Sequence, residues 1–460
     1  MAPAEVAISQ TDSAFENFSE AVREWKQKVR DSSFSRSEPI LSVEVFVRHS
    51  GPQGKVKPLT IIDHPSDWTS ASLKGREQEY TYQWTAADTQ ELDDAVKRVQ
   101  PSISTEDDVL KLSKADFHLP QLSAKLVAIG KEVTHGRGFH LVKGFPIDIY
   151  RNDRIGLVLA FWAVALALGR VQVSQTDYTE DGTTFGSVLN HVTVGRKTHV
   201  KVNPGHPKPA AGNNVDGNSQ GDKDFKDPGK SLDKNREFLP FHSDQGATDL
   251  IALLSLTAAP KGGESKWVSS LAIHNELLRQ GRKDLVEALS AKNTWFIPRK
   301  YDQATWERTP DGQYAGYEEI VPFEYHDGYL SVYFNNGNFH EISKQLSPIQ
   351  EEAIWAVAKL AEDPEFHFSR KLEPGDLELI HNPTMMHSRS DVYDGETPLE
   401  KRHLLRWWVH SDANDRPIAP TFAPRSSVRP EGGFKYDAGT KLRLPFFPYS
   451  RHDGEGQSPY

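Results

Sequence analysis

The most informative absence in this sequence is that of cysteine, because none of its 460 residues is a Cys. That absence excludes disulfide scaffolds, zinc fingers, thiolate-held iron–sulfur clusters and cysteine nucleophiles. Any metal must therefore be held by nitrogen and oxygen ligands. An excess of basic residues is lacking too, since 64 Asp and Glu outnumber 54 Lys and Arg and give a formal net charge of −10. This balance argues against a general nucleic-acid binder, which would carry a basic patch or stripe.

Long hydrophobic runs are also missing. The longest apolar stretch, GLVLAFWAVALALG at residues 156–169, is shorter than the roughly 20 residues that a membrane-spanning helix needs, and it predicts a buried core helix. The N-terminus has no basic region followed by an apolar run, so no secretory signal is expected. We therefore expect a cytoplasmic protein without a membrane partner.

The N-terminal region predicts helices and short strands. Residues 12–31 have the periodicity of an amphipathic helix, which we interpret as packing on its own domain; a helix that forms a homo-oligomer is the alternative. Residues 41–48 alternate as a strand does, and a helix is expected around Glu91–Val99. A helix at 119–133 then leads into a buried, glycine-bounded strand within 136–147.

A long polar segment divides the chain. Residues 203–235 contain almost no large apolar side chains, so they predict a loop, either a lid or a disordered insert. Beyond it we expect strands at 249–257, 265–270, 377–381 and 402–409 and a helix at 271–280. A further helix should begin at Ser347-Pro348, with Gln350 completing a capping box. Short strands without a βαβ rhythm favour a β-sandwich or barrel decorated by helices.

A metal site is indicated directly after this segment. In FHSDQG, His242 and Asp244 are two residues apart at the start of a strand-like run, and residues i and i+2 of an extended chain point to the same face. With a distant histidine they would form the 2-His-1-carboxylate triad, which leaves open positions on a non-heme Fe(II). Both His381 and His387 are candidates for that third ligand.

Other copies of the pattern lack this context. His410-Ser411-Asp412 is interpreted as a turn at a strand end, and His274 is expected on the exposed side of a helix. Arg402 and Arg406, by contrast, would share one face of a strand downstream of His242. Two guanidinium groups on one face suit a dianionic co-substrate, because Arg binds carboxylates bidentately and stays charged.

These residues resemble the TauD/TfdA family of Fe(II)- and 2-oxoglutarate-dependent dioxygenases, within the clavaminate-synthase-like superfamily. The resemblance covers roughly residues 135–410, with weaker similarity from about residue 63. It rests on seven motifs in order, which are GRGFHLVKGFPI, LGRVQVSQ, FHSD, GGES, SPIQ, HNPTMMHSR and RHLLRWWV. The implied fold is α+β, a double-stranded β-helix (jelly-roll) core flanked by helices, with an N-terminal extension.

The resemblance also implies roles for single residues. His242 and Asp244 match the proximal iron ligands, and His387, followed by Arg389, matches the distal ligand ahead of His381. Arg402 matches the residue that binds the distal carboxylate of 2-oxoglutarate, and Ser265 stands where related enzymes place a threonine that assists it. Arg406 matches a residue near the C1 carboxylate and the substrate. Further expected substrate contacts are Gln175, Asn190 and Tyr333.

The expected function follows from this resemblance. Using Fe(II), 2-oxoglutarate and O₂, the enzyme would oxidise a small carboxylate, sulfonate or amino acid with release of succinate and CO₂. Asp244 occupies the position that halogenating relatives leave to chloride, so hydroxylation, desaturation or ring closure is favoured. The alternatives are a non-catalytic jelly-roll binding protein, a zinc hydrolase that uses the same His/Asp cluster, and an oxygenase that modifies proteins. The prime substrate does not follow from the sequence.

The sequence predicts four parts of the chain. Residues 1–40 form a tail with the amphipathic helix, and residues 41–135 a lead-in region that packs on the core. The dioxygenase core spans 136–412 and contains the insert at 203–235, while 413–460 form a C-terminal tail.

Overall fold

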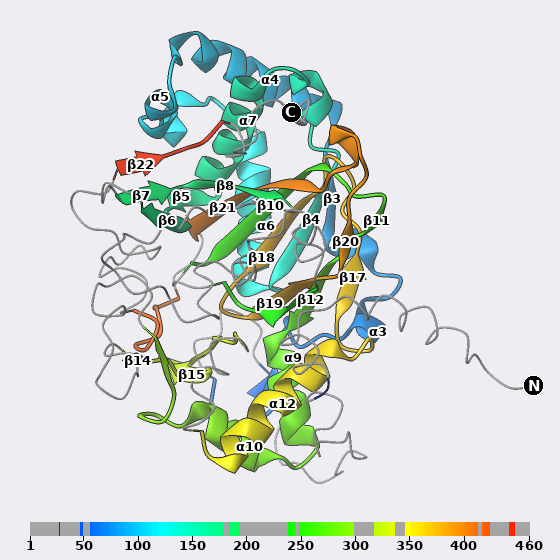
Figure 1. Cartoon of the computed structure of the whole chain (residues 1–460), viewed down its shortest axis with the longest axis vertical. Coiled ribbons are helices and arrows are strands. Elements are labelled where there is room, and N and C mark those ends of the chain that lie inside the picture. Colours follow the sequence, from blue (N-terminus) through cyan, green and yellow to red (C-terminus); the bar gives the residue numbers. More distant parts are fainter. Residues whose placement is uncertain are drawn as a thin grey trace, which may run out of the picture.

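The structure is a computed structural model of the whole chain (Figure 1). It describes residues 56–178, 184–193, 238–244, 248–298, 317–335, 346–412, 416–423 and 441–446, together with Gln27 and residues 47–48. Apart from Gln27, which is helical, the helix predicted at 12–31 lies outside the described residues. So do the insert at 203–235 and most of the strand predicted at 41–48, of which β1 (Val47–Arg48) is described.

The larger sheet has seven strands in the order β3–β4–β18–β10–β21–β5, and β8 pairs with the first part of β21. Only the β3–β4 pair is parallel; the other pairs are antiparallel. Its strands are β3 (Thr81–Gln83), β4 (Phe139–Lys143), β5 (Gly169–Gln172), β8 (Leu189–Thr193), β10 (Leu250–Thr257), β18 (Leu377–His381) and β21 (His403–Ser411). Every residue of β10 is buried, as expected of a central strand covered on both faces.

A smaller sheet lies against the inner face of the larger one. Its four strands are ordered β17 (Phe368–Arg370), β12 (Ser265–Ser269), β19 (Met385–Arg389) and β9 (Leu239–His242). Between the sheets, the Trp267 ring of β12 stacks on Phe139 of β4 with centroids 6.1 Å apart, and on Phe368 with centroids 5.3 Å apart. These rings fill one end of the space between the sheets.

Helices cover the outer side of each sheet (Figure 1). On the larger sheet, Trp407 of β21 meets Phe161 and Trp162 of α7 (Arg154–Leu168), with ring centroids 5.5 and 5.2 Å apart. Behind the smaller sheet, Val268 and Met386 share a second apolar core with three helices. Those helices are α9 (Ser270–Arg279), α10 (Lys283–Ser290) and α12 (Pro348–Glu362).

The remaining elements are short. The part of the chain before β4 contains β2 (Ile62–Asp63), α3 (Ser70–Leu73), α4 (Ala86–Val99), α5 (Glu106–Leu110) and α6 (Leu122–His135). Beside the larger sheet, β22 (Lys441–Arg443), β7 (Thr184–Ser187) and β6 (Gln175–Tyr178) form a three-stranded sheet. The other described strands form two-stranded sheets. β1 pairs with β2 in parallel. Three pairs are antiparallel, namely β11 (Lys261–Gly262) with β20 (Val392–Tyr393), β13 (Phe296–Pro298) with β14 (Tyr317–Glu319), and β15 (Phe323–His326) with β16 (Tyr329–Val332).

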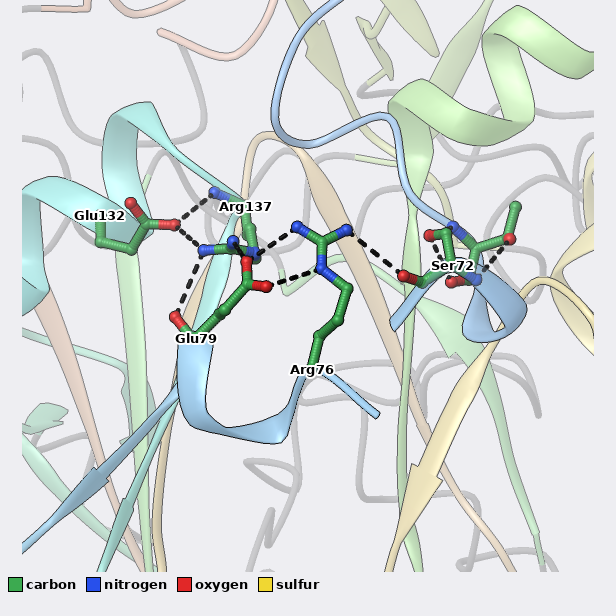
Figure 2. Close-up of polar contacts among 6 residues, drawn as sticks. Ser72, Arg76, Glu79, Glu132 and Arg137 are labelled. Atoms are coloured by element: carbon green, nitrogen blue, oxygen red, sulfur yellow. Dashed lines mark hydrogen bonds and ion pairs between the residues drawn. The ribbon is translucent and has the colours of Figure 1, made fainter. Parts of the chain in front are cut away.

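Ion pairs connect the segment after α3 to the end of α6 (Figure 2). Glu79 binds Arg76 at 2.8 Å and also Arg137, whose other guanidinium nitrogen binds Glu132 at 2.7 Å. Because such surface pairs each contribute little, on the order of 0–1 kcal/mol, the buried rings of the lead-in region matter more. Among these rings, Trp68 and Tyr80 pack on Phe139 with centroids 5.1 and 5.2 Å apart.

Most expected elements are present with shifted ends. The apolar run at 156–169 is α7, a core helix, and no helix among the described residues is both long and apolar enough to cross a bilayer. The capping box is confirmed, since the backbone N–H of Ser347 donates to Gln350 Oε1 at 3.0 Å at the start of α12. The mixture of antiparallel sheets and separate helices agrees with the expected α+β class. The segment boundaries at 40, 135 and 412 stay predictions.

Candidate metal centre

Two strands of the smaller sheet bring the first site residues together. β9 ends at His242, β19 contains His387, and the two residues are direct cross-strand partners in the antiparallel pair. Their imidazole centroids are therefore only 4.3 Å apart. Asp244 follows two residues after His242, beyond the end of the strand, and its carboxylate lies close to both rings.

The three side chains present one ligand atom each. Asp244 Oδ1 is 3.6 Å from His242 Nε2 and 3.5 Å from His387 Nε2. Within the described part of the chain, these three form the only group of three or more His, Asp or Glu side chains whose ligand atoms all lie within 4.8 Å of one another. Two imidazole nitrogens and one carboxylate oxygen at this spacing can all reach one ion at about 2.1 Å. The donor set fits a non-heme Fe(II) site.

The second carboxylate oxygen of Asp244 is occupied by the larger sheet. Asp244 Oδ2 accepts a hydrogen bond from Trp408 Nε1 at 2.8 Å and lies 3.3 Å from Arg406 Nη1. Arg406 and Trp408 are two residues apart on β21, so both point to its inner face. Because Oδ2 is held by these donors, Oδ1 is the oxygen left facing the histidines.

Backbone contacts fix the position of the same residues. The Asn382 side chain accepts from the Asp244 N–H at 2.8 Å and donates to the Asp244 carbonyl at 3.0 Å. His242 Nδ1 is 2.8 Å from the Pro240 carbonyl, which leaves Nε2 directed at Asp244. His387 Nδ1 has no hydrogen-bond partner among the described residues.

The electrostatics favour the metal-binding protonation states of Asp244 and His387. Burial alone would raise the pKa of the Asp244 carboxyl group, but the charge of Arg406 and the contacts with His242 and His387 outweigh it and hold that pKa well below its usual range. Burial and the neighbouring His242 lower the pKa of His387. An anionic carboxylate and neutral imidazoles are the forms that bind a metal ion.

Arg402 and Ser265 lie at the ends of neighbouring strands. Arg402 directly precedes β21, is 7% exposed, and donates from Nε to the Gly263 carbonyl at 3.2 Å. No other described residue accepts a hydrogen bond from its guanidinium group. Burial, with the nearby charge of Arg389, lowers the pKa of Arg402 to about 9, so its guanidinium group is charged at neutral pH. Ser265 begins β12 and is buried.

The three expected substrate contacts lie in different parts of the structure. Asn190 of β8 is the cross-strand partner of Arg406, and its amide donates to Ser174 Oγ at 2.6 Å. Tyr333 is buried and lines a cavity that also contains Asp244. Gln175 begins β6, but its side chain lies outside the described part of the structure.

The other histidines considered as metal ligands do not belong to this group of ligand atoms. His381 of β18 is aligned through Leu250 with Val409, which lies three residues after Arg406 on β21, so His381 is on the opposite face of the sheet from Arg406. Its Nδ1 pairs with Thr384 Oγ1 at 2.8 Å. His410 pairs with Asp249 at 2.8 Å near the end of β21, in agreement with the expected strand end. The expectation for His274 is wrong. It is fully buried on α9 and its Nε2 lies 2.6 Å from the Tyr325 hydroxyl, because both faces of this helix are covered.

Sequence reasoning missed three polar groups around the centre. Trp408 could have been found, since it lies two residues from Arg406 in the same strand. Glu378, a buried acid on β18, and Arg416, a buried base that lines the cavity beside Asp244, had no local signal. The positions of Glu378 and Arg416 depend on how strands and segments that are distant in sequence pack together.

Comparisons with known proteins identify the family. The family model described as "Taurine catabolism dioxygenase TauD, TfdA family" matches residues 95–408. The FR-33289 synthase of Streptomyces rubellomurinus is 34% identical over 185 residues, which are 38% of this chain and 51% of that protein, so the match spans about half of that relative. The taurine hydroxylase-like protein SAT17 of Stachybotrys chartarum is 27% identical over 351 residues, 74% of this chain and 77% of that protein.

Solved structures with similarity to the chain include two iron oxygenases. Asparagine oxygenase is 15% identical, and the similarity covers 80% of this chain and 99% of that one, with a TM-score of 0.44. The non-heme iron oxygenase OrfP is 14% identical, with coverages of 79% and 99% and a TM-score of 0.46.

The hydrogen bond from Trp408 predicts a measurable contribution to metal binding. Trp408→Phe keeps an aromatic ring but removes the donor to Asp244, and we expect the affinity for Fe(II) or Mn(II) to fall roughly 10- to 100-fold. Anaerobic calorimetric titration of the metal-free protein measures it. Trp407→Phe is the matched control, because Trp407 points to α7 on the outer face. Equal affinities of the two variants would show that the indole N–H does not support the site.

Proposed function

Because this chain belongs to the TauD/TfdA family, and is therefore an Fe(II)- and 2-oxoglutarate-dependent dioxygenase, we propose that it oxidises a small anionic or amino-acid-like molecule. The oxidation would be a hydroxylation, desaturation or ring closure, with conversion of 2-oxoglutarate to succinate and CO₂. The observation that carries the proposal is the convergence of His242, Asp244 and His387 on one point between the sheets. We further propose that the two sheets are the halves of a double-stranded β-helix within a core at 136–412.

The proposed iron ligands are His242 Nε2, His387 Nε2 and Asp244 Oδ1. Trp408 and Arg406 contact Asp244 through its other oxygen, so they would not compete with the ion for Oδ1. When bound, Fe(II) supplies the activation of O₂ that couples oxidation of 2-oxoglutarate to oxidation of the substrate. The role of the chain is to orient both organic molecules at the ion and to keep water away from it.

Arg402 and Ser265 are the proposed partners of the distal carboxylate of 2-oxoglutarate. Arg402 is buried and charged, and its only described acceptor is a backbone carbonyl on Nε, so its terminal nitrogens suit a bidentate carboxylate. Ser265 on the neighbouring β12 offers a hydroxyl from the smaller sheet. The two residues come from opposite sheets, so the co-substrate would be held between them.

The proposed substrate site is the cavity beside Asp244. It is lined by Asp244, Tyr333 and Arg416 together with apolar side chains such as Ile418 and Phe422. Arg416 is 8% exposed and donates to the Leu330 carbonyl and the Ser331 hydroxyl at the cavity wall, and its positive charge there would attract an anionic group of a ligand. Arg406 is paired with Asp244 here, which favours a role in positioning the metal ligand.

The relatives support a small substrate of this kind. SAT17 is named taurine hydroxylase-like, and taurine combines an amine with a sulfonate. Succinate release stimulated by members of a panel of amino acids, carboxylates and sulfonates would identify the prime substrate class. Gln175 and Asn190 remain proposed contacts at the same site.

The central prediction concerns the carboxylate ligand. Asp244→Ala should abolish 2-oxoglutarate-dependent succinate release, because it removes the anionic iron ligand and leaves Arg406 as an unpaired buried charge. Asp412→Ala, in the second His-x-Asp sequence, is the control and should retain the activity, since Asp412 is exposed. Succinate release by the Asp244 variant would contradict the assigned triad. Zn(II)-dependent hydrolysis without any succinate release by the wild-type protein would favour a hydrolase.

A second prediction concerns the co-substrate. Arg402→Gln should raise the concentration of 2-oxoglutarate needed for half-maximal succinate release by roughly 10- to 100-fold, since a hydrogen bond to a charged group contributes about 1.5–3 kcal/mol. Lys401→Gln removes an adjacent but exposed charge and should change little. If both variants keep the wild-type requirement, another residue binds the distal carboxylate.

A further inference from the structure

The turn between β11 and β12 is bonded to the chain directly after β19, the strand that contains His387. The backbone N–H of Gly263 in this turn donates to the Asp391 carbonyl at 2.8 Å. The backbone N–H of the next residue, Glu264, donates to Ser390 Oγ at 2.9 Å. The turn therefore has a defined position relative to a proposed iron ligand.

Gly263 contacts the Arg402 side chain in two ways. Its carbonyl accepts a hydrogen bond from Arg402 Nε at 3.2 Å, and no other described residue accepts one from this guanidinium group. A Cβ atom on residue 263 would lie 2.9 Å from Arg402 Cδ and 3.3 Å from Arg402 Nε, so the Arg402 side chain would have to move. Arg402 thus occupies the space in which any other amino acid at position 263 would carry its side chain.

The backbone angle and the close approach are separate features of Gly263. Its φ is +77°, which residues with a Cβ atom rarely adopt. Gly75, in the exposed turn after α3, has nearly the same φ of +78°, yet nothing lies within 4 Å of the position of its Cβ atom. The turn conformation alone therefore does not require the contact with Arg402.

The Arg402 side chain is held at both of its ends. Arg402 is 7% exposed, and its backbone N–H donates to Asp394 Oδ1 at 2.8 Å. At the other end, the Gly263 carbonyl binds Nε and leaves the two terminal nitrogens for a ligand. Two parallel N–H groups match the two oxygens of a carboxylate only when the guanidinium group is correctly oriented.

We propose that Gly263 is a positioning residue of the co-substrate site. Its carbonyl and its lack of a side chain together orient the Arg402 guanidinium group toward the distal carboxylate of 2-oxoglutarate. This inference rests on the proposed function, in which Arg402 binds that carboxylate. Gly263 acts through Arg402, so its replacement should weaken binding of the distal carboxylate and leave the metal centre unchanged.

Calorimetric titration of the Mn(II)-loaded full chain separates this role from a general structural one. Gly263→Ala should weaken the binding of 2-oxoglutarate roughly 10-fold, because the added methyl group displaces Arg402 from its hydrogen bonds with a charged carboxylate. Pyruvate is the second probe, since it has the same 2-oxo acid group but no distal carboxylate. The affinities for pyruvate and for Mn(II) should stay at their wild-type values.

Gly75→Ala is the matched control, because it adds a methyl group at nearly the same φ but in open space. It should leave the affinities for both 2-oxo acids unchanged. In an Arg402→Gln background, Gly263→Ala should cause no further loss of 2-oxoglutarate affinity, since the side chain through which it acts is already gone. If Gly263→Ala does not fold, Gly263→Asn adds a Cβ atom with a residue that tolerates a positive φ better.

Two results would overturn this inference alone. One is an unchanged 2-oxoglutarate affinity in the Gly263 variant, and the other is an equal loss of affinity for pyruvate. If Arg402→Gln binds 2-oxoglutarate as tightly as the wild-type protein does, the proposed co-substrate site is wrong, and the role of Gly263 is wrong with it.

Discussion

The Asp244 carboxylate is the contact through which the two sheets form one site. One of its oxygens faces His242 and His387 of the smaller sheet, and the other accepts from Trp408 and pairs with Arg406 of the larger sheet. A buried carboxylate costs several kcal/mol unless it is paired and hydrogen-bonded, so the separation of the sheets and the register of β21 must keep all these partners in reach. The same requirement orients the remaining oxygen toward a metal ion.

The interior around this contact differs in charge from the whole chain. The protein is acidic overall, with a formal net charge of −10, yet Arg402, Arg406 and Arg416 are each buried near the centre. Arg406 is compensated by Asp244, whereas Arg402 faces the proposed co-substrate site with the Gly263 carbonyl as the only described acceptor of its side chain. A dianionic co-substrate would therefore complete the charge balance at Arg402.

Local signals predicted much of the architecture. The apolar run that forms α7, the capping box at Ser347 and the strand at 377–381 depend on neighbouring residues, and each is present. The spacing of His242 and Asp244 is local as well, and the structure places His387 beside them. His274 was misplaced because burial of its helix on both faces depends on packing by distant segments. The positions of Glu378 and Arg416 and the donor role of Trp408 depend on strand register and sheet packing. Local sequence patterns do not reveal these.

The most direct test of the central assignment is a crystal structure of the full chain, grown anaerobically with Fe(II) and 2-oxoglutarate, with anomalous diffraction measured at the iron edge. We expect one strong iron peak bound by His242 Nε2, His387 Nε2 and Asp244 Oδ1, with 2-oxoglutarate reaching from the ion to Arg402. An iron peak at other residues, or 2-oxoglutarate bound away from Arg402, would contradict it.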